Sequence, residues 1–193
     1  MVIPLKIPTC DQFTDQELVD FCLSNPDLYV ERDEKGQLYI NMSPTHLLTS
    51  ANNSELNGEL FWWNRRTKTG KVFDSNGGFF LKDSSMRAPD LAWVKKERWD
   101  ALTKAEKKSF AYLAPDFVLE LQSDTDSLPE LKLKMEKWIL NGVRLAWLVS
   151  TNTQKTYVYR PEQVTIEKDF TEKLSGEDVL EGFEVVLSDI LEY

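Results

Sequence analysis

The sequence predicts an α/β fold in which a mixed β-sheet is flanked by helices, and three observations support this class. The chain has 193 residues, 41% hydrophobic and 28% charged, a composition that suits one domain with a sizeable core. A strand, a helix and a second strand follow one another between residues 117 and 149, as in a parallel crossover. With 8 glycines and 8 prolines, the chain has too few of either for a fibrous or low-complexity protein.

The first 45 residues predict a helix and a hairpin that decorate the core of the domain at its N-terminal end. Thr14 and Glu17 have the spacing of a capping box, which marks the start of a helix over residues 15–24. Two short segments, 29–32 and 37–41, flank a turn and predict a hairpin.

Residues 48–150 are expected to form the core of the domain. The pattern predicts an amphipathic helix over residues 48–68, with Gly70 as its C-terminal cap. Segments 71–74 and 78–81 are separated by turn residues and predict a second hairpin.

The rest of the chain continues this alternation. The later elements, in order, are a strand at 90–94, helical turns over 97–108, a strand at 116–122, a helix over 129–141, a strand at 144–149, and edge strands at 156–159 and 163–166. The last two strands and an acidic tail make up residues 155–193. We therefore expect one domain over residues 1–193.

The net charge of −9 is unevenly distributed. Residues 1–40 carry 8 acids and 3 bases, and residues 162–193 carry 10 acids and 2 bases. The central residues 41–161 therefore hold the remaining 14 acids and 18 bases, a net charge of +4. Such a basic segment is either solvated surface or an electrostatic footprint for phosphates.

Cysteine and histidine are scarce, which limits the kinds of metal site and catalytic site that the chain can form. Cys10 and Cys22 show no metal-binding spacing and are expected to be reduced. The single histidine, His46, excludes a site with two or three histidines on one metal. No apolar run is long enough to cross a membrane, and we expect a cytoplasmic protein with no membrane partner. If the protein is an enzyme, we expect carboxylates and lysines to be the groups that carry out the reaction.

Two acidic residues are candidates for a shared site. Asp90 begins one strand, and Glu120 lies within another, on the face that it shares with Val118 and Gln122. A carboxylate covered by a helix ionises only at high cost unless a partner neutralises it. Mg²⁺ shared by Asp90 and Glu120 would be such a partner, and an acid that faces water or Arg87 is the alternative.

Lysines on the helix over 129–141 add a second chemical group. Lys134 and Lys132 flank the apolar stripe of this helix, so that neither points directly away from the sheet. An ammonium group there could orient a metal-bound water and stabilise charge that develops on phosphorus. Alternatively, the lysine stems cover the apolar stripe while their charged ends reach water.

Several segments together resemble the bacterial Uma-type family of restriction-endonuclease-like proteins, which is placed in the PD-(D/E)XK nuclease superfamily. The segments that carry the resemblance are Met86 to Val94, Ala114 to Ser123, Leu131 to Trp138, Asn141 to Val143 and Ala146 to Val149, with Gly78, Phe79 and Leu174 to Leu180. The similarity extends over residues 12–190. It implies a restriction-endonuclease-like fold, with a mixed sheet between helices.

The resemblance also implies site residues. Asp90 and Glu120 would be catalytic acids that bind Mg²⁺ or Mn²⁺. Where the superfamily motif has a lysine two residues after the acid, this chain has Gln122, which could still offer its backbone carbonyl to the metal. The family supplies its lysine from the following helix, at the position of Lys134. Asn53 stands where relatives often place a polar residue or a histidine that faces the site.

Two functions from different classes follow from these residues. The first is a Mg²⁺-dependent endonuclease that hydrolyses DNA, with Arg65, Arg66, Lys68 and Arg87 binding nucleic acid. The second is an inactive nuclease fold that binds nucleic acid or a protein partner, which the glutamine at position 122 and the negative net charge favour. A homodimer, in which acidic ends meet the basic centre of another copy, is a further hypothesis.

Overall fold

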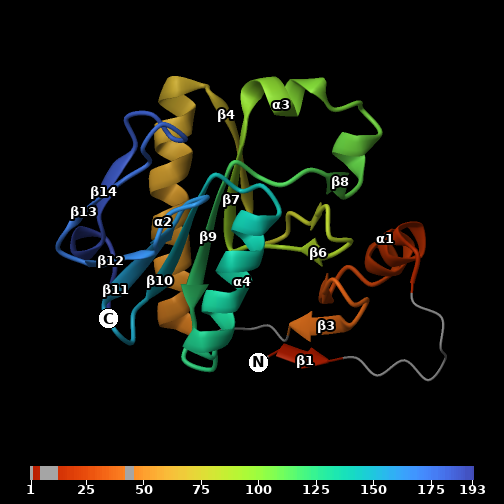
Figure 1. Cartoon of the computed structure of the whole chain (residues 1–193), viewed down its shortest axis with the longest axis horizontal. Helices are drawn as coiled ribbons and strands as arrows, with labels where there is room; N and C mark the ends of the chain where they lie inside the picture. Colours follow the sequence, from red (N-terminus) through yellow and green to blue (C-terminus); the bar gives the residue numbers. More distant parts are fainter. Residues whose placement is uncertain (1, 5–12, 42–45) are drawn as a thin grey trace.

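The computed structural model describes residues 2–4, 13–41 and 46–193, and contains two six-stranded sheets with helices packed against them (Figure 1). This arrangement confirms the predicted mixed α and β class. Cys22 is a free thiol, whereas Cys10 lies outside the described residues. None of the described helices is both long enough and apolar enough to cross a membrane.

The central sheet has the strand order β12-β11-β10-β9-β7-β4. Its strands, in chain order, are β4 (Gly70–Asp74), β7 (Leu91–Lys95), β9 (Phe117–Gln122), β10 (Leu145–Ser150), β11 (Lys155–Tyr159) and β12 (Ile166–Asp169). Strands β9 and β10 are parallel and are joined through α4 (Leu128–Leu140), which confirms the predicted crossover. The other neighbouring strands in this sheet are antiparallel.

Helices cover both faces of the central sheet, with α2 (Leu47–Thr67) on one and α4 on the other (Figure 1). Side chains of β9 alternate between these faces, as predicted. Phe117, Leu119 and Leu121 pack in the core beneath α2, whereas Val118 packs in the core beneath α4. The alternation fixes which side chains of β9 can take part in a site on the α4 side.

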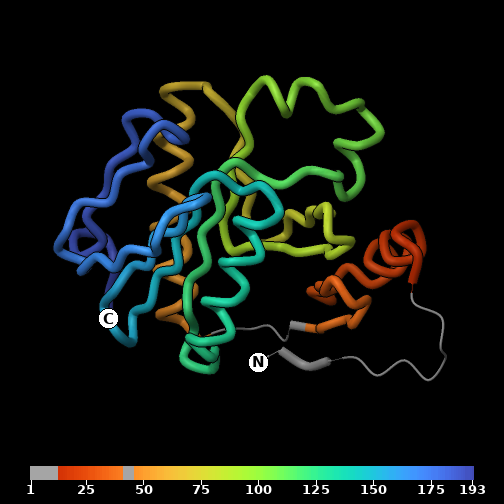
Figure 2. Tube along the Cα trace, viewed as in Figure 1, coloured from red at the N-terminus to blue at the C-terminus, as the bar shows by residue number. Residues whose placement is uncertain are grey.

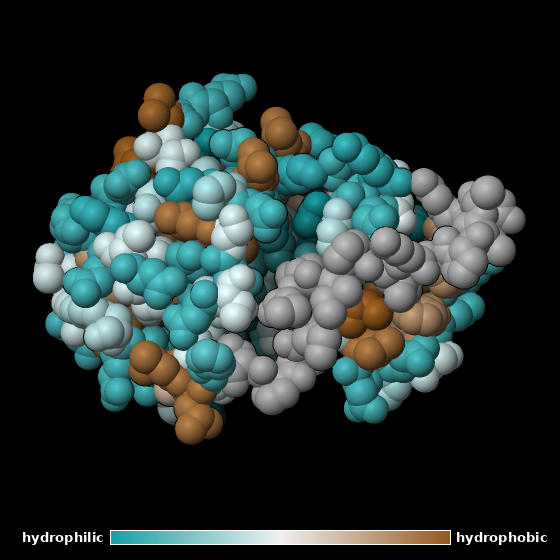
Figure 3. Space-filling view, turned by 90° about the horizontal axis from the view of Figure 1, so that it is seen from below, coloured by the Kyte–Doolittle hydropathy of each residue, from teal (hydrophilic) through white to brown (hydrophobic). Residues whose placement is uncertain are grey.

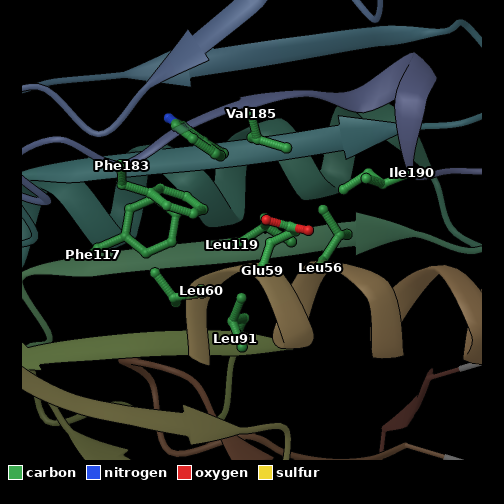
Figure 4. Close-up of a pocket in the computed structure, with 10 residues that line it drawn as sticks. Leu56, Glu59, Leu60, Leu91, Phe117, Leu119, Phe183, Val185 and Ile190 are labelled. Carbon is green, nitrogen blue, oxygen red and sulfur yellow. The ribbon is translucent and has the colours of Figure 1, made fainter. Parts of the chain in front are cut away.

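The C-terminal segment packs against the α2 side of the sheet. It contains β13 (Lys173–Ser175), β14 (Glu184–Val186) and η2 (Leu187–Asp189). Figure 4 shows a gap here, lined mainly by apolar side chains from α2, the sheet and this segment. Its volume of about 10 Å³ leaves room for no more than one water molecule. A larger pocket of about 290 Å³, between α1 and η1, contains none of the predicted site residues.

The second sheet combines N-terminal and central strands, in the order β1-β3-β2-β6-β5-β8. Its strands are β1 (Val2–Pro4), β2 (Tyr29–Arg32), β3 (Leu38–Asn41), β5 (Phe79–Phe80), β6 (Met86–Arg87) and β8 (Ala111–Tyr112). Helix α1 (Asp15–Ser24) begins with the predicted capping box and packs on this sheet. In Figure 2 the N-terminal hairpin approaches the yellow-green part of the chain. The hairpin is therefore joined to the core rather than appended to it.

Two predictions about residues 70–81 are wrong. The strands do not form a hairpin, because β4 pairs with β7 in the central sheet and β5 pairs with β6 and β8 in the second. Helix α2 ends at Thr67, and its C-terminal cap is Lys68, with a φ of 56°, rather than Gly70. Gly70 is required for close packing instead, since a Cβ there would lie 2.3 Å from the carbonyl oxygen of Val94 and 2.4 Å from the Trp93 ring.

The remaining differences concern short elements. The predicted helical turns are α3 (Lys96–Ala101) and η1 (Glu106–Lys108). Strand β11 is an interior strand between β10 and β12, so its prediction as an edge strand is wrong. The final edge strand begins at Ile166, the last residue of the predicted range 163–166, because residues 161–165 form a turn and an irregular segment.

Candidate active site

The pairing of β7 with β9 brings Asp90 and Glu120 to the α4 side of the central sheet. Asp90 immediately precedes β7, and its Oδ2 accepts a hydrogen bond from the backbone N–H of Leu121 at 2.7 Å. Glu120 lies between two residues that pack beneath α2, so its own side chain faces α4. The two acids, thirty residues apart in sequence, therefore converge as the sequence predicts.

Helix α4 supplies two partners to the Glu120 carboxylate. The indole N–H of Trp138 donates to Glu120 Oε1 at 3.0 Å, and Lys134 Nζ lies 2.9 Å from the same oxygen. Only 5% of the Glu120 side chain is exposed. Burial raises the pKa of Glu120 to about 7, with contributions from the charges of Asp90 and Glu31, although Lys134 acts in the opposite direction.

Lys134 lies between two carboxylates. Its Nζ is 2.9 Å from Glu120 Oε1 and 3.1 Å from Glu31 Oε1. Burial alone would lower the pKa of Lys134, but the charges of Glu120, Glu31 and Asp90 outweigh burial and raise it. The ammonium group therefore stays charged at neutral pH. Lys134 lies where the sequence predicts, beside the buried Glu120 and on the side of the sheet that Asp90 also faces.

Glu31 is a residue of this cluster that the sequence analysis missed. It comes from β2, in the second sheet, and its Oε1 also accepts the backbone N–H of Ala88 at 2.9 Å. Arg87 NH1 lies 3.8 Å from Glu31 Oε2. The sequence offers no local signal for it, because its position beside Lys134 depends on the long-range pairing of Arg32 with Met86.

Asp90 is held in a similar environment. Burial raises the pKa of Asp90, and the negative charges of Asp126 and Glu31 raise it further. The hydrogen bond from the Leu121 N–H and the positive charge of Lys134 lower it, but they do not outweigh burial. A carboxyl group that ionises with difficulty is stabilised by any added cation nearby. The same holds for Glu120, so both acids gain from a positive charge placed between them.

The chemistry of these acids fits a hard cation. Within the described part of the chain, no hydrogen bond involves Asp90 Oδ1 or Glu120 Oε2, which leaves one oxygen of each carboxylate for a ligand. Among the same residues, no group of three or more His, Cys, Asp or Glu side chains is arranged to hold a metal. Mg²⁺ suits such a site, because it uses one or two protein carboxylates and keeps several waters.

Gln122 is on the same face as Glu120, but its side chain is occupied. Its Oε1 accepts from the hydroxyl of Ser150 at 2.6 Å, and its Nε2 donates to the carbonyl of Asp126 at 3.1 Å. These bonds connect the end of β9 to β10 and to the loop before α4. The side-chain amide thus organises the loop next to the acids.

The predicted basic residues divide into two groups. Arg65 and Arg66 are exposed in the last turn of α2, and Lys68 follows them. The pairing of Gly70 with Lys95 places this end of α2 at the far end of β7 from Asp90. Five residues of strand span roughly 16 Å, so this group is not part of the acid cluster.

Arg87 and Asn53 lie in enclosed positions. Arg87 is 7% exposed, and its NH2 lies 3.7 Å from Glu34 Oε2, while its Nε is buried without a partner in the described structure. It borders the cluster through Glu31. Asn53 belongs to α2, which covers the opposite face of the sheet, and its Oδ1 is also buried without a described partner.

The lower surface of the molecule is hollowed. Strand β9 ends at this side (Figure 1). Figure 3 shows this side from below, with a hollow bordered by hydrophilic residues between the left-hand and right-hand parts of the view. The grey atoms in that view belong to residues outside the description.

Comparison with known proteins identifies relatives of this fold. The family model described as "Uma2: Putative restriction endonuclease" matches residues 15–188. A solved structure described as "a putative nuclease belonging to DUF820", from Anabaena variabilis ATCC 29413, is similar over 83% of this chain and 88% of that chain. The TM-score is 0.70 and the sequence identity is 19%, so the likeness concerns the fold. No protein with a curated description matches this sequence.

Proposed function

This chain belongs to the Uma2 family of restriction-endonuclease-like proteins, and we propose that it is a metal-dependent endonuclease that hydrolyses phosphodiester bonds in DNA. The observation that carries the proposal is the convergence of Asp90, Glu120 and Lys134 on one face of the central sheet. Family membership and fold support a nuclease, and the chemistry of these three residues supports a metal-assisted hydrolysis.

In this proposal Asp90 and Glu120 hold Mg²⁺ or Mn²⁺. The bound cation supplies an activated water and a positive charge for the phosphate oxygens. The Leu121 N–H orients Asp90, and the Trp138 N–H orients Glu120, so the two carboxylates are held by the sheet and by α4. Exclusion of solvent around Glu120 strengthens its interaction with any cation.

Lys134 has the second role in the proposal. Its ammonium group remains protonated and lies beside Glu120, which would place a positive charge next to the scissile phosphate. Its position on α4 compensates for Gln122, which replaces the lysine of the superfamily motif. Arg87 is the predicted nucleic-acid-binding residue nearest to this cluster, through Glu31. Arg65, Arg66 and Lys68 would contact DNA at a distance from the acids.

The proposal extends to the setting of this activity. We propose a single domain over residues 1–193 that acts in the cytoplasm, with the N-terminal hairpin included because β2 pairs with β6. The segregation of charge along the chain supports a salt-sensitive homodimer. Light scattering at increasing salt concentrations tests it: we expect the dimer to dissociate, and a monomer at low salt would contradict it.

A catalytically inactive binding module is the second candidate function. One observation favours it: Gln122 is uncharged where the superfamily motif has a lysine, and its side chain is committed to Ser150 and to the Asp126 carbonyl. In such a protein the acids would bind a cation without hydrolysis, or Lys134 would remain their permanent counter-ion.

Metal titration and a cleavage assay test both candidates. We expect Mg²⁺ or Mn²⁺ to raise the melting temperature of the wild type, and Glu120→Gln or Asp90→Ala to remove that increase. Glu34→Gln is the matched control, because Glu34 is a paired acid of the same region that contacts Lys137 instead. Supercoiled DNA at low salt should be nicked by the wild type and by Glu34→Gln, but not by Glu120→Gln or Asp90→Ala. A thermal shift without nicking favours the binding module, and the absence of both refutes the metal site.

A further inference from the structure

We propose that Glu31 is a positioning residue of this site: it holds the Lys134 ammonium, so that Glu120 and Asp90 are free to accept a cation. The inference rests on the proposed function, since it assumes a cation between these two acids. It also gives the N-terminal hairpin a role in the chemistry, although β2 belongs to a different sheet from the two acids.

The contacts of Lys134 lead to this inference. Its Nζ is shared between Glu120 Oε1 at 2.9 Å and Glu31 Oε1 at 3.1 Å, and the lysine side chain is only 18% exposed. A cation that binds to Glu120 repels this ammonium group. Because a largely buried ammonium group needs a nearby anion, Lys134 must remain paired with Glu31 when a cation binds to Glu120. Without Glu31, Lys134 would compete with the cation for Glu120.

Glu31 is itself held in a fixed position. The backbone N–H of Ala88 donates to its Oε1 at 2.9 Å, and Ala88 lies two residues before Asp90, between β6 and β7. Its Oε2 faces Arg87 at 3.8 Å. One carboxylate therefore connects the hairpin, the segment that precedes Asp90, and the lysine of α4.

The arrangement favours an indirect role for Glu31 over direct binding of the cation. Glu31 Oε1 already accepts a hydrogen bond from the Ala88 N–H and forms an ion pair with Lys134. The described residues also contain no group of three acids arranged to hold a metal. Glu31 thus acts through Lys134, and its importance for cation affinity depends on the presence of that lysine.

A double-mutant cycle measures this dependence. Mn²⁺ affinity is determined by isothermal titration calorimetry for the wild type, Glu31→Gln, Lys134→Met and the double variant. We expect Glu31→Gln to weaken Mn²⁺ binding by about tenfold in the wild type, the lower end of effects seen for residues that orient metal ligands. In the Lys134→Met background the same substitution should weaken binding less than about threefold, because no ammonium competes.

Glu34→Gln is the matched control for this cycle. Glu34 lies in the turn of the same hairpin and shares Arg87 with Glu31, but it pairs with Lys137, which does not contact Glu120. We expect this substitution to leave Mn²⁺ affinity unchanged. Equal losses for Glu31→Gln with and without Lys134 would show that Glu31 binds the cation directly and would overturn the inference, as would no loss at all.

Two further measurements separate this inference from the proposed function. If Glu120→Gln abolishes Mn²⁺ binding and Glu31→Gln does not weaken it, the metal site stands and only the role of Glu31 is wrong. Urea unfolding of the same four proteins without metal tests the contact between Glu31 and Lys134 independently. Additive effects on stability would overturn the inference even in a protein that binds no Mn²⁺. Glutamine keeps the acceptor for the Ala88 N–H, so the variant is expected to fold.

Discussion

The Glu120 carboxyl group should make the metal-free protein less stable as the pH rises through neutrality. In the folded protein burial raises its pKa from 4.5 to about 7. The folded state therefore holds this proton more tightly than the unfolded chain, and between these pH values folding loses free energy as the pH increases. Each pH unit corresponds to about 1.4 kcal/mol, which gives a loss of about 2–3 kcal/mol between pH 5 and pH 8.

Glu120→Gln tests this magnitude, because glutamine keeps an acceptor for Trp138 and cannot ionise. The free energy of unfolding is measured in urea between pH 5 and pH 8, with a chelator present. The difference between wild type and variant should change by about 2–3 kcal/mol over this range. Parallel pH profiles would show that Glu120 ionises as freely as an exposed acid, and would refute the argument from burial.

Three further substitutions test packing and local hydrogen bonds by urea unfolding. Gly70→Ala should destabilise the protein by about 1–3 kcal/mol, because its Cβ would overlap the neighbouring strand. Gly58 has open space around it, so Gly58→Ala should be neutral or stabilising by up to about 1 kcal/mol. Similar values for both variants would contradict the packing argument. Gln122→Ala should cost about 1–3 kcal/mol by leaving the Ser150 hydroxyl without its acceptor, and should leave Mn²⁺ affinity within about threefold of wild type; a total loss of binding would show a direct role in the metal site. Thr14→Ala should cost about 1 kcal/mol through loss of the helix cap, and no measurable change would show that the cap is not a stabilising contact.

The elements that the sequence predicts correctly depend on short-range patterns. The two-residue alternation of β9 assigns Glu120 to the α4 face, and the helical periodicity of α4 places Lys134 beside it. The capping box at Thr14 is equally local. Such features follow from residues within a few positions of one another, so the convergence of Asp90, Glu120 and Lys134 could be predicted from spacing and family resemblance together.

Long-range pairing was the limit of prediction. The segments 71–74 and 78–81 have strand patterns and a turn between them, but β4 and β5 join different sheets. Nothing within these residues distinguishes a hairpin from two strands that diverge. Glu31 was missed for the same reason, since its position beside Lys134 depends on the pairing of Arg32 with Met86.

The contacts of Gln122 in the structure are ones that a lysine at the same position could not make. Gln122 Oε1 accepts from the buried hydroxyl of Ser150, and its Nε2 donates to the Asp126 carbonyl. A lysine has donors but no acceptor, so it could not satisfy the serine in this way. The positive charge instead comes from Lys134, on the helix that follows the loop anchored by Gln122. One side chain could not both anchor the loop and carry the charge here. Gln122 anchors the loop, and Lys134, on the helix that follows it, carries the charge.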